Sequence, residues 1–388
     1  MEIDFLRQFL NEYNMSREEF DSMVREMEKD QISFILDEKN CDIGKKKNLV
    51  KTIYQGLLSY KKSNFIANKP ELDHLRLIFL GTAAGGTVLS QKERTGGFIL
   101  ESGTTRIHVD TGPSAVKDCV DYSVLSQMDY NPILTDALLL THNHIDHSGG
   151  AEEYVETMTF SNLLSATKSV IGNKTVMEGN PDFDQGPRLD KYRKAKLKLA
   201  SSMNAGDSVK IDDITIRATK ALHTEAYDPI SKRESRDHCI GFVLETPYGV
   251  LGITGDTEYI DSLPEDFEGV DYLVANIVQE RSRAGGEAER YSGKLAALHS
   301  QFLGELGAEK LLSEVRPKVC FLNHYGDQLA TIEDGRVAYK SIPEAIAKRI
   351  EKKTKVKTIA ALNGARADLG EDIEIDVNRK FFMGSNNF

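Results

Sequence analysis

The chain has 388 residues, which is enough for one large α/β domain and a smaller accessory unit, because domains usually hold about 100 to 200 residues. Its formal net charge of -11 excludes a surface that is basic throughout, as binders of long nucleic acids usually require a basic stripe. No apolar run approaches the roughly 20 residues that span a bilayer, the start lacks a basic secretory signal, and the cysteines form no CxxC pair (Cys41, Cys119, Cys239, Cys320). We therefore expect a cytoplasmic protein without disulfides or membrane contact.

Residues 1–70 predict a small helical extension. Their apolar side chains recur at the three- and four-residue spacing of helices, and Ser16 with Glu19 forms a capping box. Pro70 marks the end of the unit. Such a unit could make a homodimer contact, cover a site or recruit a partner, and its apolar stripes fit equally well with packing onto a core.

Lysines gather between residues 44 and 70, where acidic residues are absent: Lys45, Lys46, Lys47, Lys51, Lys61, Lys62 and Lys69. The segment is a candidate anion-binding face, which keeps nucleic acid open as a partner. The alternative interpretation is an ordinary solvated helix surface.

From residue 75 onward, short apolar runs between turn residues predict strands. The runs lie at 75–80, 97–101, 106–109, 137–140, 209–218, 240–245, 250–253, 272–277, 319–322 and 358–362. Helices are predicted at 148–164 and 295–315. The polar, partly basic stretch 165–205 is expected either to border a site or to form an exposed helix after the Gly186-Pro187 turn. Because strands and helices alternate, the pattern predicts an α/β fold.

A cluster of potential metal ligands follows the predicted strand 137–140: His142, His144, Asp146 and His147. Alternate side chains of an extended segment point the same way, so His142 and His144 can bind one metal ion. The turn that follows can direct Asp146 and His147 toward another. Isolated histidines are more often hydrogen-bonded structural residues, and we expect this of His74, His108 and His238.

Two metal ions need more ligands than this cluster supplies. Three candidates follow later strand-like runs, namely His223, Asp256 and His324. Imidazole and carboxylate ligands without thiolate suit Zn²⁺ best, and also Mn²⁺ or iron.

The ordered set HxHxDH, His, Asp, His resembles the metallo-β-lactamase superfamily over roughly residues 75–365. The resemblance implies an αββα sandwich, with residues 75–388 forming the hydrolase domain. It also implies that His142, His144 and His223 hold one metal, that Asp146, His147 and His324 hold the second, and that Asp256 bridges them. Gly81-Thr82 and Asp110-Thr111-Gly112 match further landmarks, and Asp110 is expected to orient ligands rather than bind metal.

Asp256 stands where the best-known β-lactamases have a cysteine, so the resemblance does not imply antibiotic hydrolysis. The ligand set, the Phe79-Leu80-Gly81-Thr82 opening and Gly255-Asp256-Thr257 look more like the phosphodiesterase branch, which includes the tRNA 3'-end-processing ribonuclease. That branch carries an additional histidine, to which His299 is similar in place. His299 is expected to assist the leaving oxygen, or else to cap or pack its helix.

The expected reaction uses a hydroxide that bridges two metals about 3.5 to 4 Å apart, with Asp146 accepting or orienting its proton. The expected substrates are small-molecule, nucleotide or nucleic-acid phosphodiesters. One alternative is hydrolysis of a lactone, thioester or other ester on the same fold. The non-enzyme alternative is a nucleic-acid-binding or assembly protein with structural metals, which salt-dependent binding without the metal ligands would favour.

Overall fold

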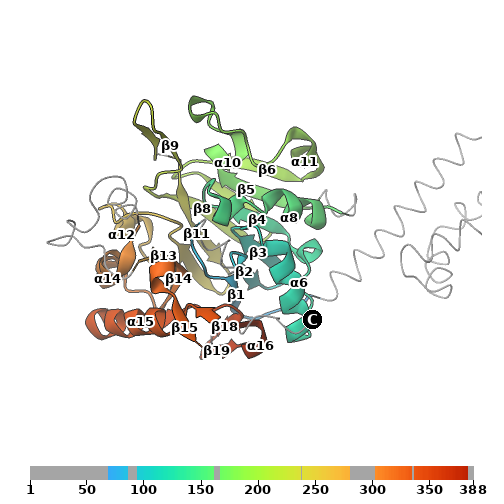
Figure 1. The fold of residues 1–388 in the computed structure, drawn as a ribbon. Helices are drawn as coiled ribbons and strands as arrows, with labels where there is room; N and C mark the ends of the chain where they lie inside the picture. Colours follow the sequence, from blue (N-terminus) through green and yellow to red (C-terminus); the bar gives the residue numbers. More distant parts are fainter. Residues whose placement is uncertain are drawn as a thin grey trace, which may run out of the picture. The chain divides into compact units, whose positions relative to one another are not determined.

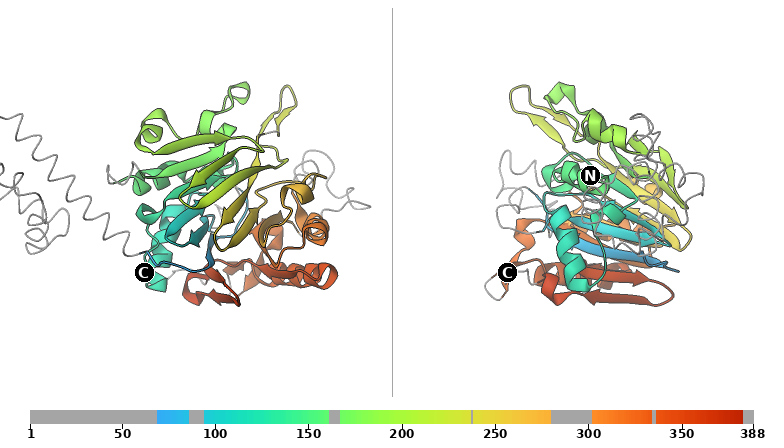
Figure 2. Two further views of the ribbon diagram at one scale, coloured as in Figure 1. Left: turned by 180° about the vertical axis from the view of Figure 1, so that it is seen from behind. Right: turned by 90° about the vertical axis from the view of Figure 1, so that its right-hand side faces the viewer.

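Two large β-sheets lie face to face in the computed structural model (Figures 1 and 2). The structure describes residues 69–85, 94–160, 167–236, 238–279, 302–333 and 336–382, all of which belong to the compact unit Lys69–Phe388. The predicted helical unit lies outside the described residues except for its last two positions, and so does His299.

The first sheet has eight strands, in the order β19 (Ile373–Val377), β18 (Ala365–Leu369), β1 (Leu75–Gly81), β2 (Gly97–Ser102), β3 (Thr105–Val109), β4 (Ala137–Leu140), β5 (Ser169–Asn173) and β6 (Leu199–Met203). Pairing is antiparallel from β19 to β3 and parallel from β3 to β6. The chain therefore leaves β4 and β5 at the same edge of the sheet.

The second sheet has seven strands, in the order β17 (Lys357–Ala360), β14 (Val319–Tyr325), β13 (Tyr272–Val278), β12 (Gly249–Ile253), β11 (Ile240–Thr246), β8 (Ile214–Lys220) and β7 (Ser208–Ile211). Strands β12, β13, β14 and β17 run parallel. A separate hairpin of β9 (Ala226–Asp228) and β10 (Arg233–Ser235) projects at the top of Figure 1. A second short pair joins β15 (Thr331–Glu333) to β16 (Arg336–Ala338).

Alternating side chains of each strand serve two different cores. In β1, Leu77 and Phe79 face the other sheet and pack with Phe242 and Phe321, whereas Ile78 and Leu80 belong to a cluster beneath the helices. This is the two-residue period of a strand that is buried on both faces. The apolar surface between the sheets is the main core.

Helices cover the outer face of each sheet. Helices α6 (Ala115–Ser126) and α8 (Ala151–Met158) pack on the first sheet, and α12 (Leu263–Asp266), α14 (Gly304–Val315) and α15 (Ser341–Thr354) pack on the second. Shorter helices are α7 (Ile145–Ser148), α10 (Lys174–Glu178), α11 (Lys191–Lys196) and α16 (Arg379–Phe382). The predicted αββα arrangement is confirmed. Among the described helices, none has the length and apolar character to cross a membrane.

Two element predictions need correction. The run 209–218 is two strands, because Asp212 turns the chain with a φ of +51°. Of the predicted helix 148–164, the described residues form α8, and Gly149-Gly150 separates α8 from the short helix α7 that ends at Ser148. The stretch 165–205 has a short helix, α11, after the Gly186-Pro187 turn, and it also contains β5, α10 and β6.

Candidate metal centre

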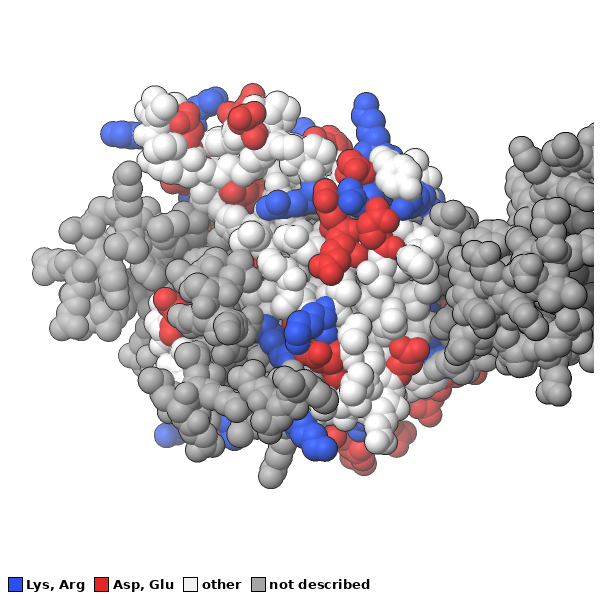
Figure 3. Space-filling view, turned by 45° about the vertical axis from the view of Figure 1, so that its right-hand side comes forward, with Lys and Arg blue, Asp and Glu red and all other residues white. Residues whose placement is uncertain are grey.

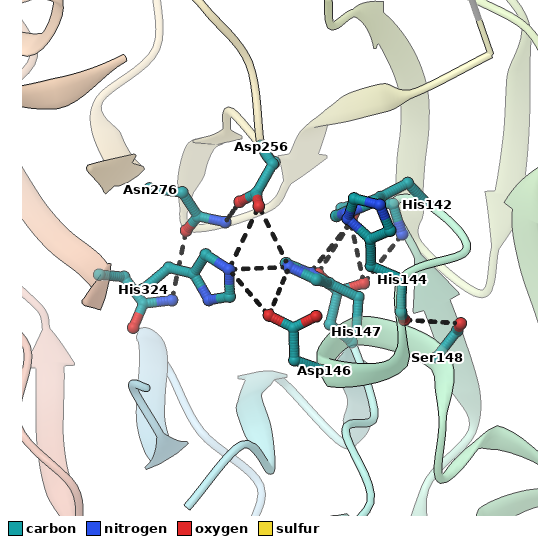
Figure 4. A network of polar contacts seen from close by, with 12 residues as sticks. His142, His144, Asp146, His147, Ser148, Asp256, Asn276 and His324 are labelled. Atoms are coloured by element: carbon teal, nitrogen blue, oxygen red, sulfur yellow. Dashed lines mark hydrogen bonds and ion pairs between the residues drawn. The ribbon is translucent and has the colours of Figure 1, made fainter. Parts of the chain in front are cut away.

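Seven predicted ligands come together at one edge of the two sheets (Figure 4). The first sheet supplies His142 and His144 from the segment after β4, and Asp146 and His147 from α7. The second sheet supplies His223 after β8, Asp256 after β12 and His324 in β14. The site thus lies at the carboxyl ends of parallel strands, where ligands usually bind in α/β folds.

His142, His144 and His223 form one group, whose ring nitrogens lie within 4.8 Å of one another. His142 Nε2 is 3.0 Å from His144 Nδ1, and His223 Nε2 is 3.1 Å from the same atom. His144 is half-buried and the other two are buried. Three imidazoles facing one point match half of a two-metal site.

Asp146, His147 and His324 form a second group within the same limit. His147 Nε2 lies 2.8 Å from His324 Nε2, which is 3.4 Å from Asp146 Oδ2. His324 has a φ of +62°, an unusual conformation for a residue with a side chain. Such strain is often found at functional sites.

Asp256 lies between the two groups. Its Oδ2 is 3.2 Å from His324 Nε2, 3.3 Å from His147 Nε2 and 4.0 Å from His223 Nε2. Its other oxygen, Oδ1, accepts a hydrogen bond of 2.9 Å from Asn276 Nδ2. Because Asn276 holds one carboxylate oxygen, the other is directed toward both groups.

Burial and neighbouring charges set the protonation of these groups. Burial raises the pKa of Asp256, but His324 and His147 outweigh it and hold that pKa well below its usual value. Burial, together with the neighbouring imidazoles, lowers the pKa of His142 well below its usual value. The chain thus offers an ionised carboxylate at Asp256 and a neutral imidazole at His142, the states in which these side chains bind metal. Burial lowers the pKa of His147, but the neighbouring carboxylates outweigh it and hold that pKa well above its usual value, so metal bound at His147 would displace a proton.

Asp110 fixes the orientation of the cluster, as predicted. Its Oδ2 accepts a hydrogen bond of 2.7 Å from His147 Nδ1, and its Oδ1 accepts one of 2.8 Å from the Thr141 amide. A carboxylate can only accept, so Nδ1 of His147 carries a proton, and Nε2 is the ring nitrogen that faces the site.

Three supporting residues were missed by the sequence analysis. Asn276 holds Asp256, Gly85 donates its amide to Asp146 Oδ2, and Glu225 accepts a hydrogen bond of 2.7 Å from the Asn143 amide. Their residue types are common in loops, and no spacing connects them to the motif. Only the fold brings them to the site.

The donor set fits divalent metal ions. It consists of five imidazoles and two carboxylates, with ring nitrogens and carboxylate oxygens converging on shared points. Zn²⁺, Mn²⁺ and iron accept such ligands. A small cavity lined by Asp146, His147, His324, Asn276 and Asn323 opens beside the second group.

Two histidines that were predicted to be structural, His74 and His108, have hydrogen-bond partners outside the metal centre. His108 is buried, with Nε2 2.6 Å from the Gly96 carbonyl and Nδ1 2.8 Å from the Tyr154 hydroxyl. His74 lies between Asp73 and Asp368.

Lys69 does not belong to an anion-binding face, because its side chain is 6% exposed and pairs with Asp136. The other lysines of that segment lie outside the described residues. Acidic and basic side chains are intermingled over the described part of the face in Figure 3, with no basic stripe among them.

Similar proteins have this fold. Residues 105–325 match the model of the beta-lactamase superfamily domain. The uncharacterized protein MJ1374 of Methanocaldococcus jannaschii is 31% identical over 298 residues, 76% of this chain and 95% of that protein. A UPF0173 metal-dependent hydrolase of Pyrobaculum islandicum is 28% identical over 161 residues, 41% of this chain and 57% of its own. The metallo-beta-lactamase fold protein YhfI from Bacillus subtilis aligns with 76% of this chain and all of its own at 16% identity, with a TM-score of 0.52, a likeness of fold alone.

Proposed function

The chain belongs to the beta-lactamase superfamily as a metal-dependent hydrolase of the metallo-β-lactamase fold, and from that premise we propose that it is a two-metal phosphodiesterase. One observation carries the proposal: Asp256, a carboxylate and not a thiolate, lies between two groups of imidazole and carboxylate ligands. Two cations suit phosphodiesters because they can stabilise both the attacking and the leaving oxygen of a displacement at phosphorus.

In this proposal, His142, His144 and His223 would hold the first metal ion, and Asp146, His147 and His324 would hold the second. Asp256 would be shared between the two ions. Zn²⁺ is the expected metal, with Mn²⁺ or iron as alternatives, since the set holds several imidazoles and no thiolate. When bound, two such ions supply Lewis-acid polarisation and a hydroxide nucleophile at neutral pH.

The chain's own residues complete the mechanism. Asp146 would accept or orient the proton of the nucleophile, and the Gly85 amide steadies its carboxylate through Oδ2. Asp110 keeps the proton of His147 on Nδ1 throughout the reaction. His299 lies outside the described residues, and its assistance to the leaving oxygen stays a prediction.

The test combines elemental analysis with hydrolysis of bis-p-nitrophenyl phosphate. We expect close to two metals per wild-type chain and phosphodiester turnover, with kcat falling by at least about 100-fold in Asp256→Ala. His299→Ala is expected to keep both metals and lose about 100- to 10,000-fold in kcat. The exposed Asp213→Asn serves as the control and should behave as wild type.

Other outcomes would redirect the proposal. Two metals with hydrolysis of a lactone or thioester, but not of phosphodiesters, would show an ester hydrolase on this fold. A folded wild-type chain that binds no metal after exposure to Zn²⁺ and Mn²⁺ would contradict the two-metal mechanism altogether.

A further inference from the structure

The backbone of Asn143, which lies between the ligands His142 and His144, is held on both sides by charged side chains: its N–H in the 142–143 peptide and its carbonyl in the 143–144 peptide each have a partner. The amide of Asn143 donates a hydrogen bond of 2.7 Å to Glu225 Oε1. Its carbonyl accepts one of 2.8 Å from Arg188 Nη2. Hydrogen bonds to ionised partners are about twice as strong as neutral ones, so these two bonds restrain the backbone of Asn143 strongly.

Glu225 is itself fixed from a different part of the fold. It is 4% exposed, and its Oε1 also accepts a hydrogen bond of 2.7 Å from Asn173 Nδ2. The Oδ1 atom of Asn173 caps α10 through the Val176 amide, and its Nδ2 donates to the His238 carbonyl. The Glu225 carboxylate is therefore held in place by Asn173 where it meets the segment that carries His142 and His144.

Arg188 is anchored on the same loop at a second point. Its Nε donates a hydrogen bond of 3.0 Å to Ser148 Oγ, and Ser148 Oγ donates one of 3.0 Å to the His144 carbonyl (Ser148 is labelled in Figure 4). Arg188 thus connects the start of the ligand segment to its end. The contacts hold the backbone on both sides of His144.

We propose that Glu225 and Arg188 are positioning residues for the group His142, His144 and His223, and this rests on the proposed metal site. The directions of the His142 and His144 rings depend on the two peptide planes that flank Asn143, because alternate side chains share a face only in an extended backbone. Glu225 fixes the first plane and Arg188 the second, which keeps both ring nitrogens aimed at one point. The second group depends instead on Asp110 and Asn276, which hold His147 and Asp256.

The inference predicts a selective loss of one metal. Removing a supporting hydrogen bond from a metal ligand typically costs 10- to 100-fold in metal affinity. The variant Glu225→Leu should therefore weaken binding at the first group and leave the second unchanged. Arg188→Met should weaken binding at the first group more than at the second, because Arg188 also bonds Ser148 in α7, which carries Asp146 and His147. Glu225→Gln should stay within about threefold of wild type, because its amide oxygen can still accept from Asn143.

Single-site backgrounds make the experiment decisive. The full chain carrying His324→Ala retains the first group intact, and the chain carrying His223→Ala retains the second. Zn²⁺ affinity is measured by competition with a chromophoric chelator, and the visible spectrum of the Co²⁺-loaded chain reports coordination geometry. Glu225→Leu should weaken Zn²⁺ binding and alter the Co²⁺ bands in the His324→Ala background only.

Matched controls are Glu178→Leu, an exposed carboxylate on α10, and Arg193→Met, a surface ion-pair residue on α11. Neither should change either affinity. Equal losses in both backgrounds, or no loss in either, would overturn the inference while leaving the two-metal proposal intact. Absence of metal from the wild type would instead remove the proposed function. Should Glu225→Leu fail to fold, the other two variants still test the inference: Arg188→Met must lose Zn²⁺ affinity at the first group, and Glu225→Gln must keep it.

Discussion

Asp110 supports the candidate centre although it belongs to none of the ligand groups. Its backbone φ is +57°, and its carboxylate connects Thr141, at the end of β4, to His147 in α7. Replacing one oxygen by an amide nitrogen leaves either Thr141 or His147 facing a donor. We expect Asp110→Asn to lower metal affinity by about 10- to 100-fold, measured by chelator competition. Unchanged affinity would contradict the orienting role.

His108 gives a prediction for the pH dependence of stability. Burial lowers the pKa of His108 from 6.5 to about 4, so the folded chain binds its proton more weakly than the unfolded chain. Its stabilising contribution is complete above pH 6.5 and is lost as the pH falls toward 4, a change of about 3 kcal/mol. Between these pH values, wild type should lose that much free energy of unfolding relative to His108→Gln, as measured by urea denaturation. Parallel pH curves would contradict the prediction.

Among the elements, α7 and α8 depend on a close backbone approach. A Cβ at Gly150 would lie 2.4 Å from the Gly112 carbonyl oxygen, whereas one at Gly186 would meet nothing within 4 Å. Gly150→Ala should therefore lower the free energy of unfolding by about 1 to 3 kcal/mol. It should also weaken metal binding, because α7 carries Asp146 and His147. Gly186→Ala is the control, and equal stability of the two variants in denaturant titration would refute the argument.

Burial explains only part of how far the elements could be predicted, because β5 is buried throughout and was not predicted. Strands such as β1 and β4 are apolar throughout and were predicted closely, because both faces are covered. Strand β6 was missed because it lies at the sheet edge and its sequence, Leu199–Met203, is half-exposed and rich in serine. The turn at Asp212 was missed because an aspartate pair between apolar residues gives a weak signal for positive φ.

The seven candidate ligands were identified from residue type and order, because few other roles explain such a cluster. Glu225 and Arg188 could not be found in this way. Glu225 meets Asn143 across 82 positions of chain, and Arg188 meets it across 45. A glutamate and an arginine in polar loops look like surface residues until the fold is known.

For the whole molecule, the proposed metals should contribute to stability. A ligand that binds only the folded state stabilises it by about 2.7 kcal/mol at 100 times its Kd. A chelator should therefore lower the melting temperature of wild type and leave that of Asp256→Ala nearly unchanged, as measured by scanning calorimetry. An equal shift in both proteins would show that the chelator acts elsewhere.

Each ligand group takes residues from both sheets: His142 and His144 with His223 in one, and Asp146 and His147 with His324 in the other. Neither group exists until the sheets have docked. Binding of the proposed metals is therefore expected late in folding, after the two sheets have packed through their apolar faces. A refolding chain should acquire its near-ultraviolet circular dichroism, which comes from its tyrosine and phenylalanine side chains, before it protects Zn²⁺ from a chelator.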